Sequence, residues 1–208
     1  MRNTVKSILL ASGGLDSTTL AYWLRQKKIP FTPLFIDYGQ HCAVTEHRTL
    51  AAVLPKNDSR RIETINIGDI YRGSHSLLIR EVNLWKHKTK AADLYLPYRN
   101  LLLLSAGAAF AQSRGASYLY AAFINSNHAK ELDCSTNFFD ELSKVLREYG
   151  SVTIRMPFRK LSKRQVTNIG LKLRVPVAST FSCQAASAVP CGACPNCVDR
   201  LDALRSFG

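Results

Sequence analysis

Short apolar runs alternate with longer amphipathic stretches along most of the chain. Each apolar run is short and apolar enough for a strand covered on both faces, and each amphipathic stretch carries apolar residues near the 3.6-residue spacing of a helix. Strands are predicted at residues 5–11, 31–37, 62–67, 117–123 and 152–154. Helices are predicted at residues 17–28, 43–54, 99–114, 137–149 and 162–173.

This alternation predicts an α/β fold built on a doubly wound, parallel five-stranded sheet, in which ligands bind beyond the carboxyl ends of the strands. Two segments depart from the pattern. Residues 69–94 have no clear period and are expected to form an insertion or a lid, and the chain from residue 178 onward is expected to be an irregular tail. The expected organisation is an α/β domain at 1–177 with a C-terminal segment, 178–208, packed on it.

The first predicted strand leads directly into residues 12–17, with the sequence Ser-Gly-Gly-Leu-Asp-Ser. Glycines at this turn allow positive φ and close approach of a ligand, and the helix that follows offers unpaired N–H groups at the positive end of its dipole. These features predict an anion site formed by Ser12, Gly13, Gly14, Ser17 and Thr18. Asp16 would repel a bare phosphate but can hold Mg²⁺ between itself and a nucleotide, which indicates nucleotide chemistry. An ordinary glycine turn capped by Ser17 is the alternative interpretation.

The chain of 208 residues carries 28 Lys and Arg against 15 Asp and Glu, a formal charge of +13. This excess favours polyanionic ligands or an acidic partner protein, and a solvated basic surface is the alternative explanation. The basic clusters are not interleaved with aromatic residues, so nucleic acid is not the favoured partner. No apolar run approaches the roughly 20 residues of a membrane span and no secretory signal is recognisable, so we expect a cytoplasmic protein without a membrane segment.

Four of the six cysteines lie close together near the C-terminus, at Cys183, Cys191, Cys194 and Cys197. Thiols separated by two residues can converge on one ion, and four thiolates suit tetrahedral zinc. An iron–sulfur cluster is the main alternative, but the downstream fourth ligand of a ferredoxin-type run is missing. We therefore predict a structural Zn²⁺ site. Cys42 and Cys134 stand apart from this cluster and are expected to be buried thiols.

The loop at residues 12–17 resembles the pyrophosphatase loop of the N-type ATP pyrophosphatases, and other segments narrow the likeness to the 7-cyano-7-deazaguanine synthase family. Residues 37–40, Asp-Tyr-Gly-Gln, followed by Glu46, resemble its F-D-Y-G-Q segment, and residues 96–100, Leu-Pro-Tyr-Arg-Asn, resemble its V-P-G-R-N. Ser162-Lys163 resembles a T-K pair, while Thr-Phe-Ser-Cys at 180–183 and the run at 191–197 resemble T-W-S-C and C-G-x-C-x2-C. The likeness extends from residue 5 to residue 205 or so.

The resemblance implies an adenine nucleotide alpha hydrolase-like fold and an AMP-forming carbon–nitrogen ligase. ATP would activate the carboxylate of 7-carboxy-7-deazaguanine, ammonia would displace AMP to give the amide, and a second ATP would drive dehydration of the amide to the nitrile. The resemblance implies that Asp16, Arg99 and Lys163 act in catalysis. Asp16 would hold Mg²⁺, and Arg99 and Lys163 would act through their positive charges. The substrate side is implied to include Asp37, Tyr38, Gln40, Tyr98, Asn100 and Asp133.

Two segments depart from the family pattern, both on the substrate side. The family's G-x-N-x-x-D-x-S-G-Y-P-D-C corresponds here to residues 122–134, where only the final Asp-Cys is kept and Glu-Leu replaces Tyr-Pro. Asn127 lies nearest to the family's acid, and Tyr98 replaces the glycine that precedes Arg-Asn. The motifs expected to bind ATP are intact. The changes therefore suggest that the acceptor amine or the acyl group differs from that of the family.

Three other functions stay open. A synthase-like enzyme of a defence gene cluster would join a deazaguanine carboxylate to an amine other than ammonia, such as one on a partner protein. A tRNA-modifying ATP pyrophosphatase would account for the charge of +13. A non-catalytic binding or assembly subunit would follow if the altered pocket no longer turns over. The sequence also leaves open whether the chain forms a homodimer.

Overall fold

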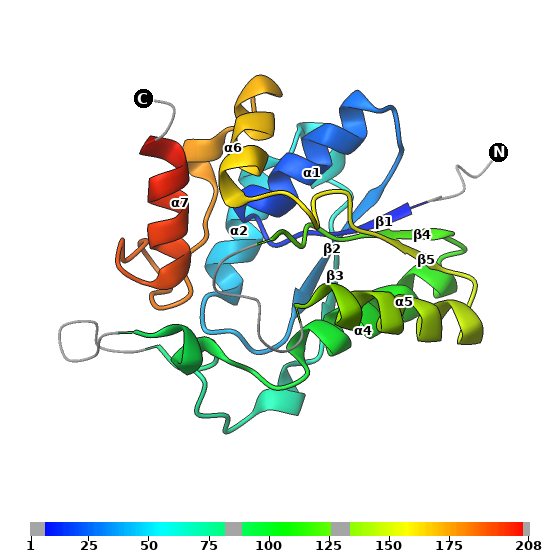
Figure 1. Cartoon of the computed structure of the whole chain (residues 1–208), viewed down its shortest axis with the longest axis horizontal. Helices are drawn as coiled ribbons and strands as arrows, with labels where there is room; N and C mark the ends of the chain where they lie inside the picture. Colours follow the sequence, from blue (N-terminus) through cyan, green and yellow to red (C-terminus); the bar gives the residue numbers. More distant parts are fainter. Residues whose placement is uncertain (1–6, 82–88, 126–133, 206–208) are drawn as a thin grey trace.

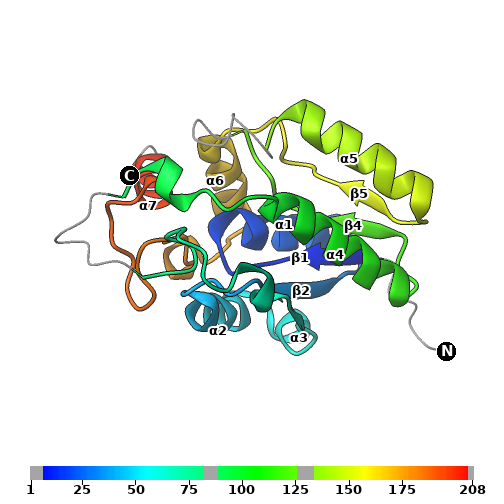
Figure 2. The same cartoon turned by 90° about the horizontal axis from the view of Figure 1, so that it is seen from below.

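The computed structural model describes residues 7–81, 89–125 and 134–205. Its centre is a parallel sheet formed by β1 (Ser7–Leu10), β2 (Thr32–Asp37), β3 (Glu63–Asn66), β4 (Tyr118–Tyr120) and β5 (Thr153–Arg155). The strand order is β3-β2-β1-β4-β5, and Figure 2 shows β2, β1, β4 and β5 side by side. The chain therefore builds outward from β1 to β3 and returns to β4 on the other side of β1, which confirms the predicted doubly wound α/β fold.

The helices cover both faces of this sheet. They are α1 (Leu15–Gln26), α2 (Ala43–Val53), α3 (Lys56–Ser59), α4 (Arg99–Ser113), α5 (Thr136–Tyr149), α6 (Lys163–Lys172) and α7 (Pro195–Arg205). Figure 1 shows α1, α2 and α6 on one side of the sheet and α4 and α5 on the other. Within β1, Ile8 packs with the core under α4 and α5, and Leu9 packs with the core under α1, α2 and α6. Successive side chains of a strand point to opposite faces, so each face receives one buried apolar residue.

Parallel pairing directs the carboxyl ends of β1, β2 and β4 to the same side of the sheet, and β2 continues to Asp37, past the Leu34 that pairs with Leu10. Leu9 of β1 lies opposite Pro33 of β2 on one side and opposite Tyr120 of β4 on the other. The carboxyl ends of β1, β2 and β4 therefore meet at one edge of the sheet, at the point where the strand order reverses. Crevices that bind ligands form at this point in doubly wound sheets.

Some boundaries differ from the predictions. Helix α1 begins at Leu15, two residues earlier than expected, and β4 ends at Tyr120, three residues earlier than expected. The tail predicted to be irregular contains the 11-residue helix α7. Pro195 occupies the first helical position of α7, where its missing N–H group costs nothing and its fixed φ suits a helix. Residues 5 and 6 of the first predicted strand lie outside the described residues.

The connection between β3 and α4 has its own apolar cluster. Its described parts include two short 3₁₀ turns, η1 (Gly68–Tyr71) and η2 (Ala91–Leu94). The cluster consists of Tyr38, Tyr71, Leu77, Leu78, Leu94 and Leu96. Through Tyr38, this connection packs against the residues that follow β2. No helix in the described part of the chain combines the length and the apolar character needed to cross a bilayer.

Candidate active site

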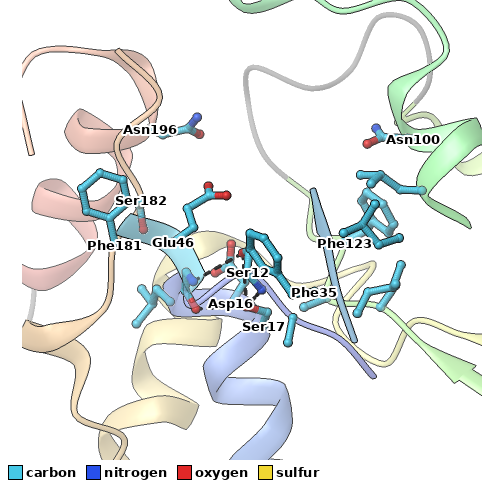
Figure 3. A pocket seen from close by; sticks show the side chains of 18 of the residues that line it. Ser12, Asp16, Ser17, Phe35, Glu46, Asn100, Phe123, Phe181, Ser182 and Asn196 are labelled. Atoms are coloured by element: carbon cyan, nitrogen blue, oxygen red, sulfur yellow. Dashed lines mark hydrogen bonds between the residues drawn. The ribbon is translucent and has the colours of Figure 1, made fainter. Parts of the chain in front are cut away.

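A cavity of about 310 Å³ lies at the carboxyl ends of β1, β2 and β4. Its volume is at the lower end of the range for small-molecule sites, roughly 300 to 1,000 Å³. In Figure 3, Ser12 and Asp16 lie below Glu46 near the middle of the view, Asn196 lies at the upper left and Asn100 at the upper right. The predicted site residues that line the cavity are Ser12, Gly14, Asp16, Ser17, Tyr38, Arg99, Asn100 and Lys163.

The two loop glycines have different roles. Gly13 has a φ of +76°, and a Cβ on it would lie 2.7 Å from the backbone nitrogen of Leu50 and 2.8 Å from the carbonyl oxygen of Glu46. Any side chain there would collide with the backbone of α2. Gly14 has a φ of −72°, so the expected positive φ applies to Gly13 alone. The loop is therefore packed directly against α2 at Gly13.

Hydrogen bonds within the loop hold its serines. The Ser12 backbone nitrogen donates to Ser17 Oγ at 3.3 Å, and Ser17 Oγ lies 3.2 Å from the Gly14 carbonyl, to which it donates. The Gly14 nitrogen donates to Ser12 Oγ at 3.4 Å. No side chain caps α1 at Gly14, so the N–H groups of its first turn keep the capacity to bind an anion.

Asp16 and Lys163 form an ion pair beside this loop. Lys163 Nζ lies 2.9 Å from Asp16 Oδ1 and 2.8 Å from Oδ2. Lys163 is the first residue of α6, which begins at this point because Ser162 caps it and accepts a hydrogen bond from the Gln165 nitrogen. The side chains of Lys163 and Asp16 are 17% and 23% exposed, so both remain accessible from the cavity. Folding thus brings together two charges that are 147 residues apart.

The turn after β2 supports the cavity through hydrogen bonds. Asp37 Oδ1 accepts from the Gly39 nitrogen at 2.9 Å, and Asp37 does not line the cavity. Gln40 is buried; its Oε1 accepts from the Tyr38 nitrogen at 2.9 Å, and its Nε2 donates to Glu46 Oε2 at 2.9 Å. Asp37 and Gln40 therefore shape the turn, while Tyr38 and Glu46 line the cavity.

Burial shifts the pKa of both of these lining residues. It raises the pKa of Tyr38 above its ordinary value, although the positive charge of Arg99 lowers it. It also raises the pKa of Glu46 to about 7, although hydrogen bonds from Gln40 and Cys42 and the charge of Arg99 lower it. Arg99 is thus the cation that influences both groups.

The start of α4 presents three predicted residues in different ways. Tyr98 precedes the helix with φ 58° and ψ 12°, in the left-handed region, and its side chain is 69% exposed outside the cavity lining. Asn100 is 1% exposed and its Nδ2 donates to Cys134 Sγ at 2.9 Å. Arg99, between them, lines the cavity. The left-handed conformation at position 98 suits glycine, because a Cβ there costs roughly 1 to 2 kcal/mol.

Two further predicted residues, Thr18 and Gly13, lie outside the cavity lining. Thr18 is fully buried, is absent from the cavity lining, and its Oγ1 has no hydrogen-bond partner in the described part of the chain. Gly13 lies behind the loop against α2. Asp133 and Asn127 lie outside the described residues.

The C-terminal segment forms one side of the cavity. Its lining residues are Phe181, Ser182, Gln184 and Asn196. The Phe181 nitrogen donates to the Gly13 carbonyl at 3.1 Å, which joins this segment directly to the loop. Ser182 Oγ is buried and has no hydrogen-bond partner among the described residues. An unsatisfied buried hydroxyl is costly, so a bound molecule is its natural partner.

The four C-terminal cysteines fit a tetrahedral metal site. Their sulfurs lie within 4.8 Å of one another, and Cys191 and Cys197 are 4.0 Å apart. Zinc–sulfur bonds of about 2.3 Å place tetrahedral sulfurs about 3.8 Å apart. Hydrogen bonds from the Cys194 and Cys197 thiols lower the pKa of Cys183, and the same contacts raise the pKa of Cys194 and of Cys197. The residues present therefore fit Zn²⁺, which would be held by Cys183, Cys191, Cys194 and Cys197.

The sequence assigns no role to some of the cavity residues. Glu46 follows the Asp-Tyr-Gly-Gln motif, and the motif itself gives its side chain no role. Ser182 lay inside the Thr-Phe-Ser-Cys motif, next to a predicted zinc ligand. Phe35, Phe123 and Asn196 line the cavity from β2, from the residues after β4 and from α7. The only sequence signal for Glu46 was an acid six residues after Gln40, which does not identify a site by itself.

Solved structures share the overall fold. A 4-thiouridine synthetase in a complex with RNA and bound ATP has a TM-score of 0.53 and 14% identity, covering 97% of this chain and 54% of that one. A predicted subunit of a tRNA methyltransferase from Methanocaldococcus jannaschii has a TM-score of 0.50 and 15% identity, covering 80% of this chain and 74% of that one. At these identities the likeness concerns the fold alone, and it agrees with the predicted ATP pyrophosphatase fold.

Sequence relatives extend over nearly the whole chain. A 7-cyano-7-deazaguanine synthase of Methanospirillum hungatei is 31% identical over 98% of this chain and 96% of its own length. One of Campylobacter hominis is 27% identical over 97% of this chain and 95% of its own length. The model of the family described as queuosine biosynthesis protein QueC matches residues 6–208. These matches confirm the resemblance read from the motifs, and the chain belongs to the QueC family.

Proposed function

We propose that this chain is a 7-cyano-7-deazaguanine synthase, which activates a 7-deazaguanine carboxylate with ATP and transfers it to ammonia. The observation that carries the proposal is the meeting of three features in one cavity: the loop at 12–17, the Asp16–Lys163 pair and Arg99. Relatives named 7-cyano-7-deazaguanine synthase at 31% and 27% identity support the substrate class.

The loop side of the cavity suits the activation step. A carboxylate oxygen attacks the α-phosphorus of ATP, and the bond to pyrophosphate breaks to leave an acyl adenylate. The loop would bind the pyrophosphate through N–H groups of α1 and the hydroxyls of Ser12 and Ser17, while Lys163 and Arg99 would stabilise the developing negative charge. Mg²⁺ held by Asp16 would neutralise the pyrophosphate.

The rest of the cavity lining suits a flat polar substrate. Phe35 and Phe123 offer apolar surfaces, and Asn100, Asn196 and the unpaired Ser182 Oγ offer polar ones. Ammonia would attack the acyl adenylate and release AMP to form the amide. A second ATP would activate the amide oxygen. This oxygen would then leave as part of AMP, and the nitrile would form.

A second candidate acceptor is a primary amine on a larger molecule. Tyr98 favours it, because this exposed aromatic side chain lies beside Arg99 and is kept in a conformation that suits glycine. Tyrosine rings are frequent in surfaces that bind other proteins. Under this alternative the activation step is unchanged, and the acyl group is transferred to the partner's amine.

The test is product analysis with defined substrates. The purified protein is incubated with Mg-ATP, 7-carboxy-7-deazaguanine and ammonium, and AMP, pyrophosphate and product mass are followed. We expect AMP release that requires the carboxylate, with masses of the amide and then the nitrile. AMP release that ignores the carboxylate and requires tRNA would contradict the proposal. AMP release without amide, but with a product after addition of another amine, would favour the second acceptor.

A further inference from the structure

The cavity contains two carboxylates in different electrostatic settings. Asp16 is neutralised by Lys163 at 2.8 and 2.9 Å. Glu46, in the first turn of α2, forms no ion pair with any cation in the described part of the chain. Figure 3 shows Glu46 projecting into the open part of the cavity above Ser12 and Asp16. Within the described residues, Glu46 is therefore a cavity carboxylate that feels the charge of Arg99 but is not joined to a cation by a direct ion pair.

The surroundings of Glu46 orient its carboxylate. Gln40 Nε2 donates to Oε2 at 2.9 Å, and Gln40 is itself held by the Tyr38 nitrogen at 2.9 Å. The charged groups that influence Glu46 are Arg99 of α4 and Asp37 at the end of β2, and Cys42, the residue before α2, donates a hydrogen bond to it. A carboxylate fixed in this way can bind a small cation with its remaining lone pairs.

The reaction proposed above needs such a group. At neutral pH ammonia is present mainly as the ammonium ion. The pKa of ammonium is somewhat below the pKa of a lysine side chain, which is about 10.4. Ammonium has no free electron pair, so it must lose a proton before it can attack a carbonyl carbon. Asp16 is engaged by Lys163 beside the pyrophosphate loop, and Asp37 is turned toward the backbone of Gly39. Among the described lining residues, Glu46 is thus the carboxylate available for this task.

We infer that Glu46 forms the ammonium subsite of the cavity and accepts the proton that the ammonium ion loses before its nitrogen attacks the acyl adenylate. The inference rests on the proposed function. The ligand class is ammonium or a small primary ammonium ion. The pKa of Glu46, about 7, lets the group exist as a carboxylate near neutral pH and still take up a proton.

Proton transfer and amide formation together conserve atoms and charge. Ammonium transfers one proton to the Glu46 carboxylate and becomes ammonia. The nitrogen lone pair forms a bond to the acyl carbon, the bond from that carbon to the AMP oxygen breaks, and AMP leaves with the electron pair. The nitrogen loses a second proton to AMP or water to give the neutral amide, and Glu46 returns its proton to solvent.

The decisive experiment compares two nucleophiles in the Glu46→Gln variant. Glutamine has the same shape and still accepts a hydrogen bond from Gln40, but it cannot take up a proton. Hydroxylamine is largely unprotonated at neutral pH and needs no such base. We expect ammonia-dependent amide formation to fall about 100-fold, with hydroxamate formation and carboxylate-dependent ATP–pyrophosphate exchange unchanged. Glu63→Gln, on the edge strand β3, is the matched control.

Other outcomes would overturn the inference. If the variant uses ammonia at the wild-type rate, Glu46 does not handle the proton. If the rates with ammonia and with hydroxylamine fall equally in the variant, Glu46 supports the structure or positions the acyl group instead. If the wild-type protein itself shows no carboxylate-dependent exchange, the proposed function fails, and this result is distinguishable because it precedes any test of Glu46.

A measurement on the wild-type protein keeps the inference testable if the variant does not fold. At fixed total ammonium, the amide-forming rate should fall below pH 7 as Glu46 becomes protonated and level off above it. Hydroxylamine should not show this fall. A rate that rises tenfold per pH unit through and beyond pH 8 would mean that free ammonia enters from solution, and would contradict the inference.

Discussion

Backbone atoms shape one end of the cavity, and side chains shape the other. At the loop, backbone atoms set the shape: Gly13 packs against the backbone of α2, and its carbonyl accepts a hydrogen bond from the Phe181 nitrogen. At the other end, the side chains of Tyr38, Arg99 and Asn100 set the shape. Backbone packing tolerates little variation, whereas a wall of side chains changes with each substitution. A substitution at the side-chain end can therefore change the shape of the cavity without disturbing the loop.

The largest effect is expected from removing the metal predicted for the four cysteines. Structural zinc in small domains contributes on the order of 10 kcal/mol of binding free energy that is coupled to folding. A chelator should therefore unfold the C-terminal segment and, through Phe181 and Ser182, weaken ATP binding. Metal analysis, thermal unfolding and ATP titration measure this, with zinc re-addition as the control. Unchanged ATP affinity in the metal-free protein would show that the loop end does not depend on this segment.

Lys163→Ala should have the next largest effect. It removes the cation of the Asp16 pair and a charge expected to stabilise the transition state, so carboxylate-dependent AMP release should fall about 10² to 10³-fold. Lys172→Ala, at the exposed other end of α6, is the matched control and should retain the wild-type rate. Equal rates in the two variants would remove Lys163 from the activation machinery.

Gly13→Ala tests the backbone packing of the loop end. Its Cβ would lie 2.7 and 2.8 Å from backbone atoms of α2, so the variant should lose about 1 to 3 kcal/mol of unfolding free energy beyond the cost of positive φ. Gly73→Ala is the matched control, because Gly73 has a φ of +82° but no atom within 4 Å of the added Cβ. Denaturant unfolding measures both. Similar losses in the two variants would mean that the contact with α2 does not constrain the loop.

Tyr98→Gly should have the smallest effect and an opposite sign. Relief of the left-handed conformation should stabilise the protein by about 1 kcal/mol, and Arg174→Gly, at φ 57°, provides the comparison. Activation should be unaffected, because Tyr98 does not line the cavity. A loss of product formation with intact ATP–pyrophosphate exchange would assign Tyr98 to the acceptor. A loss of exchange would instead place Tyr98 in the activation step.

Much of the fold was predictable because local signals agreed with one another. Apolar runs of strand length alternated with amphipathic stretches, and the five expected strands and five long helices all occur. Helix α7 was missed because its cysteines and Pro195 indicated a metal-held loop, although Pro195 in fact starts the helix. The predicted end of β4 is too late because residues 121–123 are apolar like the strand: they pack against the core and also line the cavity.

The site was predictable where a motif determines the backbone. The loop at 12–17 can be recognised from the sequence by its two glycines and the aspartate that follows them. Glu46 and Ser182 could not be assigned from spacing, because their positions depend on how α2 and the C-terminal segment pack beside β1. Asp37 and Gln40 were expected on the substrate side, and in the structure they make hydrogen bonds within the turn after β2. Pairings between distant segments, such as Asp16 with Lys163, emerge only in the folded chain.

The central claim is that this cavity activates a deazaguanine carboxylate by adenylation. Exchange of labelled pyrophosphate into ATP, measured without ammonium, tests it most directly because the activation step is then observed alone. The account predicts exchange that requires 7-carboxy-7-deazaguanine and is lost in Lys163→Ala. Absence of exchange with that carboxylate, or exchange at the same rate without it, would contradict the account.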